Sequence, residues 1–251
     1  MQATEATETR AEAPTLKQRV GKLIFPRLPI TRFLFDILRD EAVALLVRLQ
    51  NACVPSRRSR LRRLRAMRDV YVNVACGPQV LDGFVNVDLR STNPDVIRFD
   101  ARRTLPTGDG AARGIRVEQF VEHLEAREEL PAFLSDCYRT LAAGGVLRII
   151  VPDTERYLQA YCRGDLSGFW ELEVPNPFPD DLPTRMDVVN HVFHQWHEHR
   201  WAYDFETLEH RLQAAGFTRV ERAAYRSSHD AALAQDRPVH APYSLYVEAI
   251  K

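Results

Sequence analysis

The chain has 251 residues, of which 45% are hydrophobic and 27% charged, and its formal net charge is zero. These values fit one medium-sized domain with a full core, and they exclude any bulk-charge argument for a polyanionic partner. The four cysteines form no CxxC pair, which favours reduced thiols in a reducing compartment. No apolar run approaches the ~20 residues that cross a bilayer, so we expect a cytoplasmic protein.

The N-terminal part is predicted to be a tail followed by a basic helical extension. Residues 1–16 carry acids and lack an apolar core, which favours a disordered tail over a secretory signal. Residues 17–68 are expected to be helical, because leucines and valines recur at roughly helical spacing over residues 34–49.

The end of this extension, VPSRRSRLRRLRAMR, has seven arginines from Arg57 to Arg68 and no acid. We consider a solvated helix and, alternatively, a contact with anionic lipid, a lipid-linked substrate or an acidic partner. A lipid contact would bring the protein to the periphery of the inner membrane. No aromatic residues alternate with the arginines, so nucleic acid is not an expected partner.

From residue 69 onward the sequence predicts a doubly wound α/β domain. Short apolar runs predict strands, a periodic apolar stripe predicts a helix, and their order is typical of a mostly parallel sheet. The expected strands are 70–74, 84–87, 96–99, 114–120, 146–151, 218–225 and 244–250. The expected helices are 127–141, ended by Gly144 and Gly145, and 206–215, ended by Gly216. The last two strands would complete a seven-stranded sheet as an antiparallel edge hairpin, with a polar surface loop, 226–243, between them.

Ligands of such sheets bind at the carboxyl ends of the strands, and here those ends carry small or polar residues. They are Asn73, Ala75, Cys76, Gly77 and Pro78 after the first strand, Asp88 after the second, Asp100 after the third, and Glu118, Gln119 and Phe120 at the fourth. A dinucleotide site would need several loop glycines and an acid about 20 residues later. Gly77 is the only glycine of this loop and Asp88 follows eleven residues later, which disfavours a nicotinamide oxidoreductase. A ligand without phosphates fits better, with Asp88 at ribose hydroxyls and Asp100 at an adenine amino group.

Three blocks, VNVACGP…GFVNVDL, FVEHLE and FLSDCYRTLAAGGVLRIIVPD, resemble class I S-adenosylmethionine-dependent methyltransferases. The likeness extends through YDFETLEHRLQAAGF, and it is similar to a bacterial branch some of whose members are associated with surface-glycan biosynthesis. It implies a Rossmann-like methyltransferase domain over residues 69–251, S-adenosylmethionine as cofactor, and O-methylation of a small molecule, sugar or glycan. It also implies that Asn73, Ala75 and Gly77 lie near the amino-acid part of the cofactor. Glu118 to Phe120 would line the ligand.

The chain departs from the family pattern in the first loop. Ala75 and Gln79 replace glycines, and Asn73 replaces the usual acid. An alanine is tolerated at a negative φ, whereas asparagine lacks the charge that would pair with the cofactor's ammonium group. These departures motivate the alternative of a degenerate member of the fold that binds a partner without catalysis.

A hydroxyl acceptor needs a base, and histidine titrates near neutral pH. The segment NHVFHQWHEHRWAYD holds four histidines, of which the resemblance brings His197 and His199 near the active site. His197 is the first candidate base and His123 the alternative. The i, i+3 histidine spacing could hold a metal, but no cysteine lies nearby, so no metal is expected. Residues 154–201, rich in aromatic side chains, would form an insertion that covers the acceptor pocket.

Overall fold

The structure, a computed structural model, describes residues 31–165 and 182–251 of the chain. The chain divides into two units, 1–42 and 43–251. Helix α2 (Arg32–Cys53) begins in the first unit, and α3 (Pro55–Ala66) belongs to the second. Both helices lie within residues 17–68, the predicted helical extension, of which residues 17–30 lie outside the described residues, as does the predicted tail. No helix in the described ranges combines the length and hydropathy that a bilayer crossing demands.

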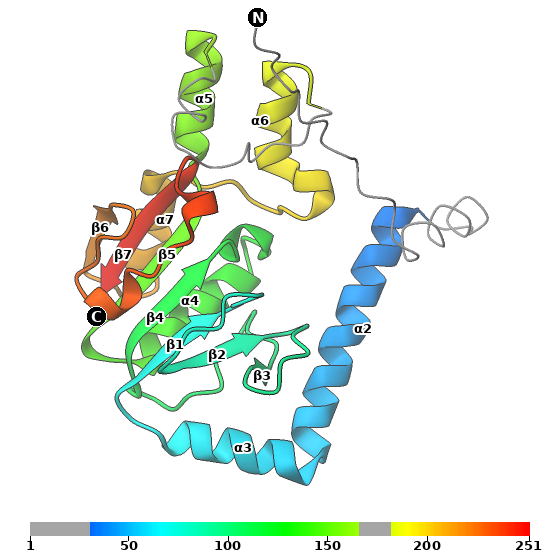
Figure 1. The fold of residues 1–251 in the computed structure, drawn as a ribbon, viewed down its shortest axis with the longest axis vertical. Coiled ribbons are helices and arrows are strands. Elements are labelled where there is room, and N and C mark those ends of the chain that lie inside the picture. The colour runs from blue at the N-terminus through cyan, green and yellow to red at the C-terminus, as the bar shows by residue number, and fades with distance from the viewer. Residues whose placement is uncertain (1–30, 166–181) are drawn as a thin grey trace, which may run out of the picture. The chain divides into compact units, whose positions relative to one another are not determined.

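A seven-stranded sheet forms the centre of the second unit, in the order β3-β2-β1-β4-β5-β7-β6 (Figure 1). Its strands are β1 (Val70–Val74), β2 (Phe84–Asp88), β3 (Ile97–Arg98), β4 (Ala112–Glu118), β5 (Leu141–Pro152), β6 (Arg219–Ala223) and β7 (Ser244–Ile250). Neighbours among β1 to β5 pair in parallel, and β7 runs antiparallel to both β5 and β6. The predicted doubly wound fold with an antiparallel C-terminal hairpin is confirmed, and β6 forms the edge. The strand order reverses between β1 and β4, the point at which such sheets open a ligand crevice.

The core forms because the central strands are apolar on both faces and because one helix carries an apolar stripe. Val72, Val87 and Ile115 are fully buried, as expected of parallel strands covered by helices on both faces. Helix α4 (Glu129–Thr140) buries its predicted stripe, including Phe133 and Leu134. Helix α7 (Phe205–Ala214) likewise confirms the second predicted helix.

The predicted end of α4 at two glycines is wrong. The helix ends at Thr140, and Leu141 already has extended backbone angles. Gly144 has a φ of +74° inside the first part of β5, and its amide donates to the carbonyl of Lys251 at 2.8 Å. Gly144 therefore adopts its left-handed conformation within the first part of the strand and does not close the helix.

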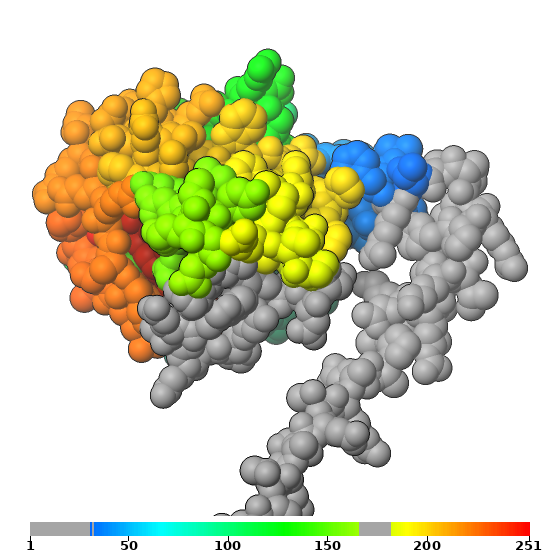
Figure 2. Space-filling view, turned by 90° about the horizontal axis from the view of Figure 1, so that it is seen from above, coloured from blue at the N-terminus to red at the C-terminus, as the bar shows by residue number. Residues whose placement is uncertain are grey.

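The segment 154–201, predicted as an insertion that covers the acceptor pocket, contains two helices among its described residues. They are α5 (Thr154–Arg163), capped by Asp153, and α6 (Arg185–His194), which begins with a capping box of Thr184 and Asp187. They lie side by side at the surface (Figure 2) and share a small core that includes Tyr157 and Val188. Residues 166–181 of the predicted insertion lie outside the described residues.

The predicted surface loop 226–243 is in part an interior element. It contains two short 3-10 helices, η5 (Ala231–Leu233) and η6 (Pro238–His240), and it buries Leu233 and Asp236. Asp236 forms an ion pair at 2.6 Å with Arg148, a fully buried side chain of β5. A buried guanidinium needs charged partners, so the polar composition of this segment serves the core and not only the surface.

Candidate active site at the carboxyl ends of the strands

A cavity of about 730 Å³ lies where β1 to β4 end. The residues of the predicted cofactor site that line it are Ala75, Gly77, Pro78, Asp88, Asp100, Gln119 and Phe120. His123, the alternative base, lines it as well, because the 3-10 helix η2 (Val121–His123) follows β4 directly. The structure thus brings the two acids and the first loop to one wall. Asn73, Cys76, Glu118 and His197 are not among the lining residues.

The first loop is held tightly against the end of β2. The amide of Cys76 donates to the carbonyl of Val87 at 3.1 Å, and the amide of Gly77 donates to Oδ2 of Asp88 at the same distance. Ala75 and Gly77 both have a φ of +51°. Ala75 therefore does not meet the condition of a negative φ under which alanine is tolerated, since the turn requires the left-handed region that glycine adopts without strain.

Asp88 organises the wall of the cavity from the end of β2. Its Oδ1 accepts hydrogen bonds from the amides of Arg90 at 2.7 Å and Ser91 at 2.8 Å, in addition to the bond from Gly77. A carboxylate offers about four lone-pair sites. About one site therefore remains for a hydroxyl group of a bound ligand.

Asp100 lines the same cavity, but its carboxylate is already paired. Oδ1 lies 3.0 Å from Nε of Arg102, and Oδ2 lies 2.5 Å from Nη2 of Arg48. Burial alone would raise the pKa of Asp100, but the hydrogen bonds and charge of Arg102, with help from Arg48, outweigh it and hold the pKa below its usual range. The predicted adenine contact thus coincides with an arginine-bound carboxylate.

Two of the predicted cofactor residues take part in a polar cluster instead. Asn73 accepts a hydrogen bond from Arg116, its register partner on β4, at 3.2 Å. Glu118 pairs with the same Arg116 and accepts from Nδ1 of His240 at 2.9 Å. Burial would raise the pKa of Glu118, and the contacts with His240 and Arg116 lower it below its usual range. Successive residues of a strand point to opposite faces, so Glu118 joins this cluster while its neighbour Gln119 lines the cavity.

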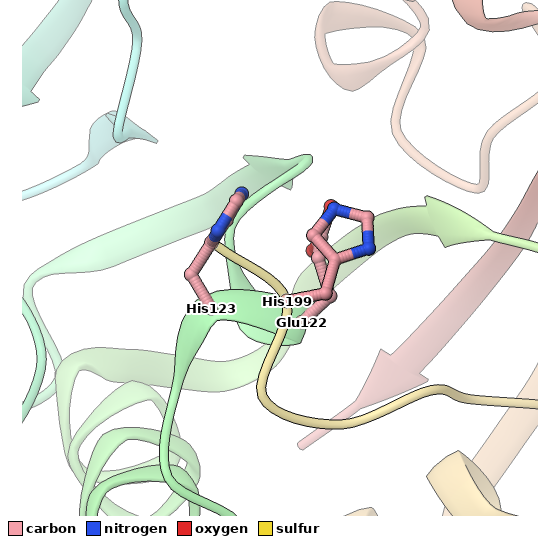
Figure 3. A group of neighbouring side chains, drawn as sticks. All are labelled: Glu122, His123 and His199. Carbon is pink, nitrogen blue, oxygen red and sulfur yellow. The ribbon is translucent and has the colours of Figure 1, made fainter. Parts of the chain in front are cut away.

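A second cluster adjoins the cavity at His123, whose ring is half-buried. Its Nδ1 lies 3.0 Å from the carbonyl of Glu198, and its ring centroid lies 5.0 Å from that of His199 (Figure 3). His199 is buried, and burial lowers its pKa to about 4. Glu122 is 1% exposed, and burial raises its pKa to about 7. His197, the first candidate base, is exposed in the 3-10 helix η4 (Gln195–His197).

The sequence alone does not connect Glu122 with His199. Their meeting depends on the segment after η4, whose Arg200 and Trp201 amides donate to the carbonyl of Glu122 at 2.8 and 3.3 Å. No spacing rule joins residues from segments so far apart in the chain. The adjacent Glu-His pair was the one signal that the sequence offered.

No family model matches the chain, and no curated protein matches it. Several solved structures are similar. An S-adenosylmethionine-dependent methyltransferase of Archaeoglobus fulgidus is 19% identical, with 77% of this chain and 92% of that chain covered and a TM-score of 0.41. One of Mesorhizobium loti is 14% identical, with 77% and 96% covered and a TM-score of 0.44.

A third similar structure is the 1,6-didemethyltoxoflavin-N1-methyltransferase of Burkholderia thailandensis, solved with S-adenosylhomocysteine. It is 14% identical, with 89% of this chain and 91% of that chain covered and a TM-score of 0.43. Likenesses at these TM-scores do not bear on the activity of this chain, which has to be inferred from its own site.

Proposed function

We propose that the chain is an S-adenosylmethionine-dependent methyltransferase that binds the adenosine of the cofactor in the cavity at the ends of β1 to β4. The observation that carries the proposal is the junction of Gly77 and Asp88, where a tight loop is bonded to a strand-end acid at the switch point of the sheet. Such a site suits a nucleoside without phosphates, because the first loop has no glycine-rich turn opening a helix.

The residues present fit this cofactor in part. A Cβ built on Gly77 would meet nothing within 4 Å, so the loop leaves open space on that side. Asp88 would accept a ribose hydroxyl, and Gln119 and Phe120 would lie along the ligand. Asp100 already accepts four hydrogen bonds from Arg48 and Arg102, so it would meet the adenine amine only by exchanging one of them. Asn73, Cys76 and Glu118 do not line the cavity. They would act indirectly, by holding the first loop and β4 in place.

When bound, the cofactor would supply an electrophilic methyl group, and the chain would position the acceptor and remove its proton. Positioning can contribute roughly 7–11 kcal/mol in favourable cases, and a base about 10²–10⁴-fold. Of the two histidine candidates we favour His123, since it lines the cavity and His197 does not. The bond from Nδ1 of His123 to the Glu198 carbonyl leaves Nε2 with a lone pair for the acceptor's proton. The acceptor would be a hydroxyl of a small molecule, sugar or glycan, covered by the segment that contains α5 and α6.

Calorimetric titration of the full chain with S-adenosylmethionine and S-adenosylhomocysteine tests the proposal. We expect both to bind, and we expect Asp88→Asn to raise the Kd about 10- to 100-fold, because a hydrogen bond to a charged group is worth about 1.5–3 kcal/mol. Asp82→Asn is the matched control, as Asp82 is an exposed acid of the preceding turn that does not line the cavity. Unchanged affinity in Asp88→Asn would contradict the proposed cofactor site.

A second candidate function is a degenerate methyltransferase fold that binds a partner without catalysis. The specific observations in its favour are the left-handed Ala75 and the arginine-paired Asp100, both in the wall where the adenosine would lie. Absence of binding of either compound at millimolar concentration would favour this candidate over the enzyme.

A further inference from the structure

Three potential metal ligands meet beside the cavity, at the junction of η2 with the segment after η4. Glu122, His123 and His199 each present one ligand atom, and these atoms all lie within 4.8 Å of one another (Figure 3). Two backbone bonds hold the junction, from the amides of Arg200 and Trp201 to the carbonyl of Glu122. The cluster is therefore set by the backbone and not by mobile side chains alone.

The hydrogen bonds of the two histidines leave the same ring atom available in each. Nδ1 of His123 lies 3.0 Å from the carbonyl of Glu198, and Nδ1 of His199 lies 2.7 Å from the carbonyl of Val192. A carbonyl can only accept, so each ring carries its proton on Nδ1 and keeps a lone pair on Nε2. Metal-binding histidines are typically oriented in this way, by donating the other ring N–H to a backbone carbonyl.

The buried donors of the cluster have no hydrogen-bond partner among the described residues. Nε2 of His199 and both carboxylate oxygens of Glu122 are buried without one. Glu122 is 1% exposed, and an isolated carboxylate at such a position is costly unless it is paired with a cation. A single cation would satisfy all of these atoms at once.

We propose that Glu122, His123 and His199 form a binding site for a divalent first-row metal ion, with Zn²⁺ as the best fit. Two neutral imidazoles and one carboxylate are a donor set that zinc accepts with one coordination position left open. Tetrahedral bonds of about 2.0–2.1 Å place donors roughly 3.3 Å apart, so the side chains would close on the ion by small rotations. The prediction of no metal considered only the later histidines, which have no cysteine nearby, whereas this cluster combines residues from different segments.

The site does not depend on cofactor binding, and it stands if the chain binds no S-adenosylmethionine. Because His123 lines the cavity, the open position of the ion would be within reach of a bound acceptor. If both proposals hold, His123 would bind the ion and not act as the base, and the ion would instead lower the pKa of the acceptor hydroxyl. Failure of one proposal is therefore distinguishable from failure of the other.

The test is metal binding to the untagged full chain after treatment with a chelator. We expect one Zn²⁺ per chain by competition with a chromophoric chelator, and Co²⁺ to give the visible absorption bands of a low-symmetry site with nitrogen and oxygen ligands. Saturating Zn²⁺ should raise the Tm by several degrees, since an ion that binds only the folded state stabilises it. No binding of either ion would overturn the proposal.

Two variants and one control separate the site from surface histidines. Glu122→Gln and His199→Asn should each weaken Zn²⁺ binding at least tenfold and abolish the rise in Tm. Glu122→Gln guards against a folding defect, because it replaces a buried ionisable group by a neutral one of the same shape. His194→Asn, an exposed histidine on α6, should leave binding unchanged. Equal affinity in all four proteins would overturn the proposal and leave the cluster a water-bridged polar network.

Discussion

Ala75 carries a left-handed backbone conformation in the first loop of the cavity, where glycine would be unstrained. Its φ of +51° costs roughly 1–2 kcal/mol for a residue with a Cβ. Gln119, at the end of β4 in the same cavity, has a φ of +52°. Strained backbone residues cluster at binding sites when the surrounding bonds determine their conformation, as the contacts of Cys76 and Gly77 do here.

Ala75→Gly should therefore raise the free energy of unfolding. Relief of about 1–2 kcal/mol of strain is reduced by the roughly 0.5–1 kcal/mol by which glycine's freedom favours the unfolded chain. We expect a net gain of up to about 1.5 kcal/mol in urea denaturation. Ala143→Gly, at an exposed alanine without a positive φ, should lose stability instead. A loss in both variants would show that Ala75 is not strained.

For individual residues, the sequence predicted which ones end the strands, but not to which face of the sheet their side chains point. Asp88 and Asp100 line one cavity, as expected of acids on neighbouring strands. Asn73 and Glu118 join Arg116 instead, and strands buried on both faces show no alternation from which their direction could be inferred. The pairing of Glu122 with His199 depends on backbone bonds between distant segments, which no local pattern reports.

Among the elements, α3 presents its arginines to a cavity of about 810 Å³. Leu61 and Leu64 pack against the core, which fixes the helix on the domain. The arginines that line the cavity are Arg48, Arg58, Arg62, Arg65 and Arg103. Asp100 is the one acid in this lining, and it is already paired with Arg102 as well as Arg48. We propose that α3 contacts an anionic partner, such as the lipid surface at the inner face of the membrane.

Liposome binding by the full chain should accordingly fall with salt and with loss of the arginines. Each arginine near an anionic surface contributes about 1 kcal/mol. Arg62→Ala, Arg63→Ala and Arg65→Ala together should therefore weaken binding to phosphatidylserine-rich vesicles about 100-fold. Arg113→Ala, Arg127→Ala and Arg219→Ala, three exposed arginines elsewhere, are the control. Absent or salt-insensitive binding would make α3 a solvated helix.

The sequence predicted α4 and α7 but missed α5 and α6. Helix α4 has a continuous apolar stripe, and this stripe alone predicts a helix there. Helix α6 buries only a short valine set, Val188, Val189 and Val192, which is too little for a periodicity signal. Its capping box of Thr184 and Asp187 was the available signal, because a hydroxyl residue followed three positions later by an acid marks a helix start.

In the molecule as a whole, one buried ion cluster joins the centre of the sheet to the late segments. Arg148 of β5 pairs with Asp236 at 2.6 Å and with Glu248 of β7 at 2.8 Å, and all three side chains are at most 1% exposed. The guanidinium also donates to the carbonyls of Ser227 and Ala224. Tertiary pairing of this kind explains why a polar stretch that resembled a surface loop lies partly in the interior.

Arg148→Met should be strongly destabilising, because it leaves two buried carboxylates without their cation. The expected loss is about 3–5 kcal/mol in the free energy of unfolding, measured by chemical denaturation. Arg219→Met breaks an exposed pair with Glu221 and should cost about 1 kcal/mol or less. Similar small losses in both variants would mean that the cluster reorganises when its cation is removed.

The interior position of β7 constrains how the protein can be made. Seven residues late in the chain, Ser244–Ile250, fill the gap between β5 and β6. While a ribosome is still synthesising the preceding residues, β5 presents an unpaired edge and β6 has no neighbour to join. The sheet can close only after translation has passed this point. Nascent chains would therefore expose an unpaired strand edge, at which chaperone binding would compete with aggregation.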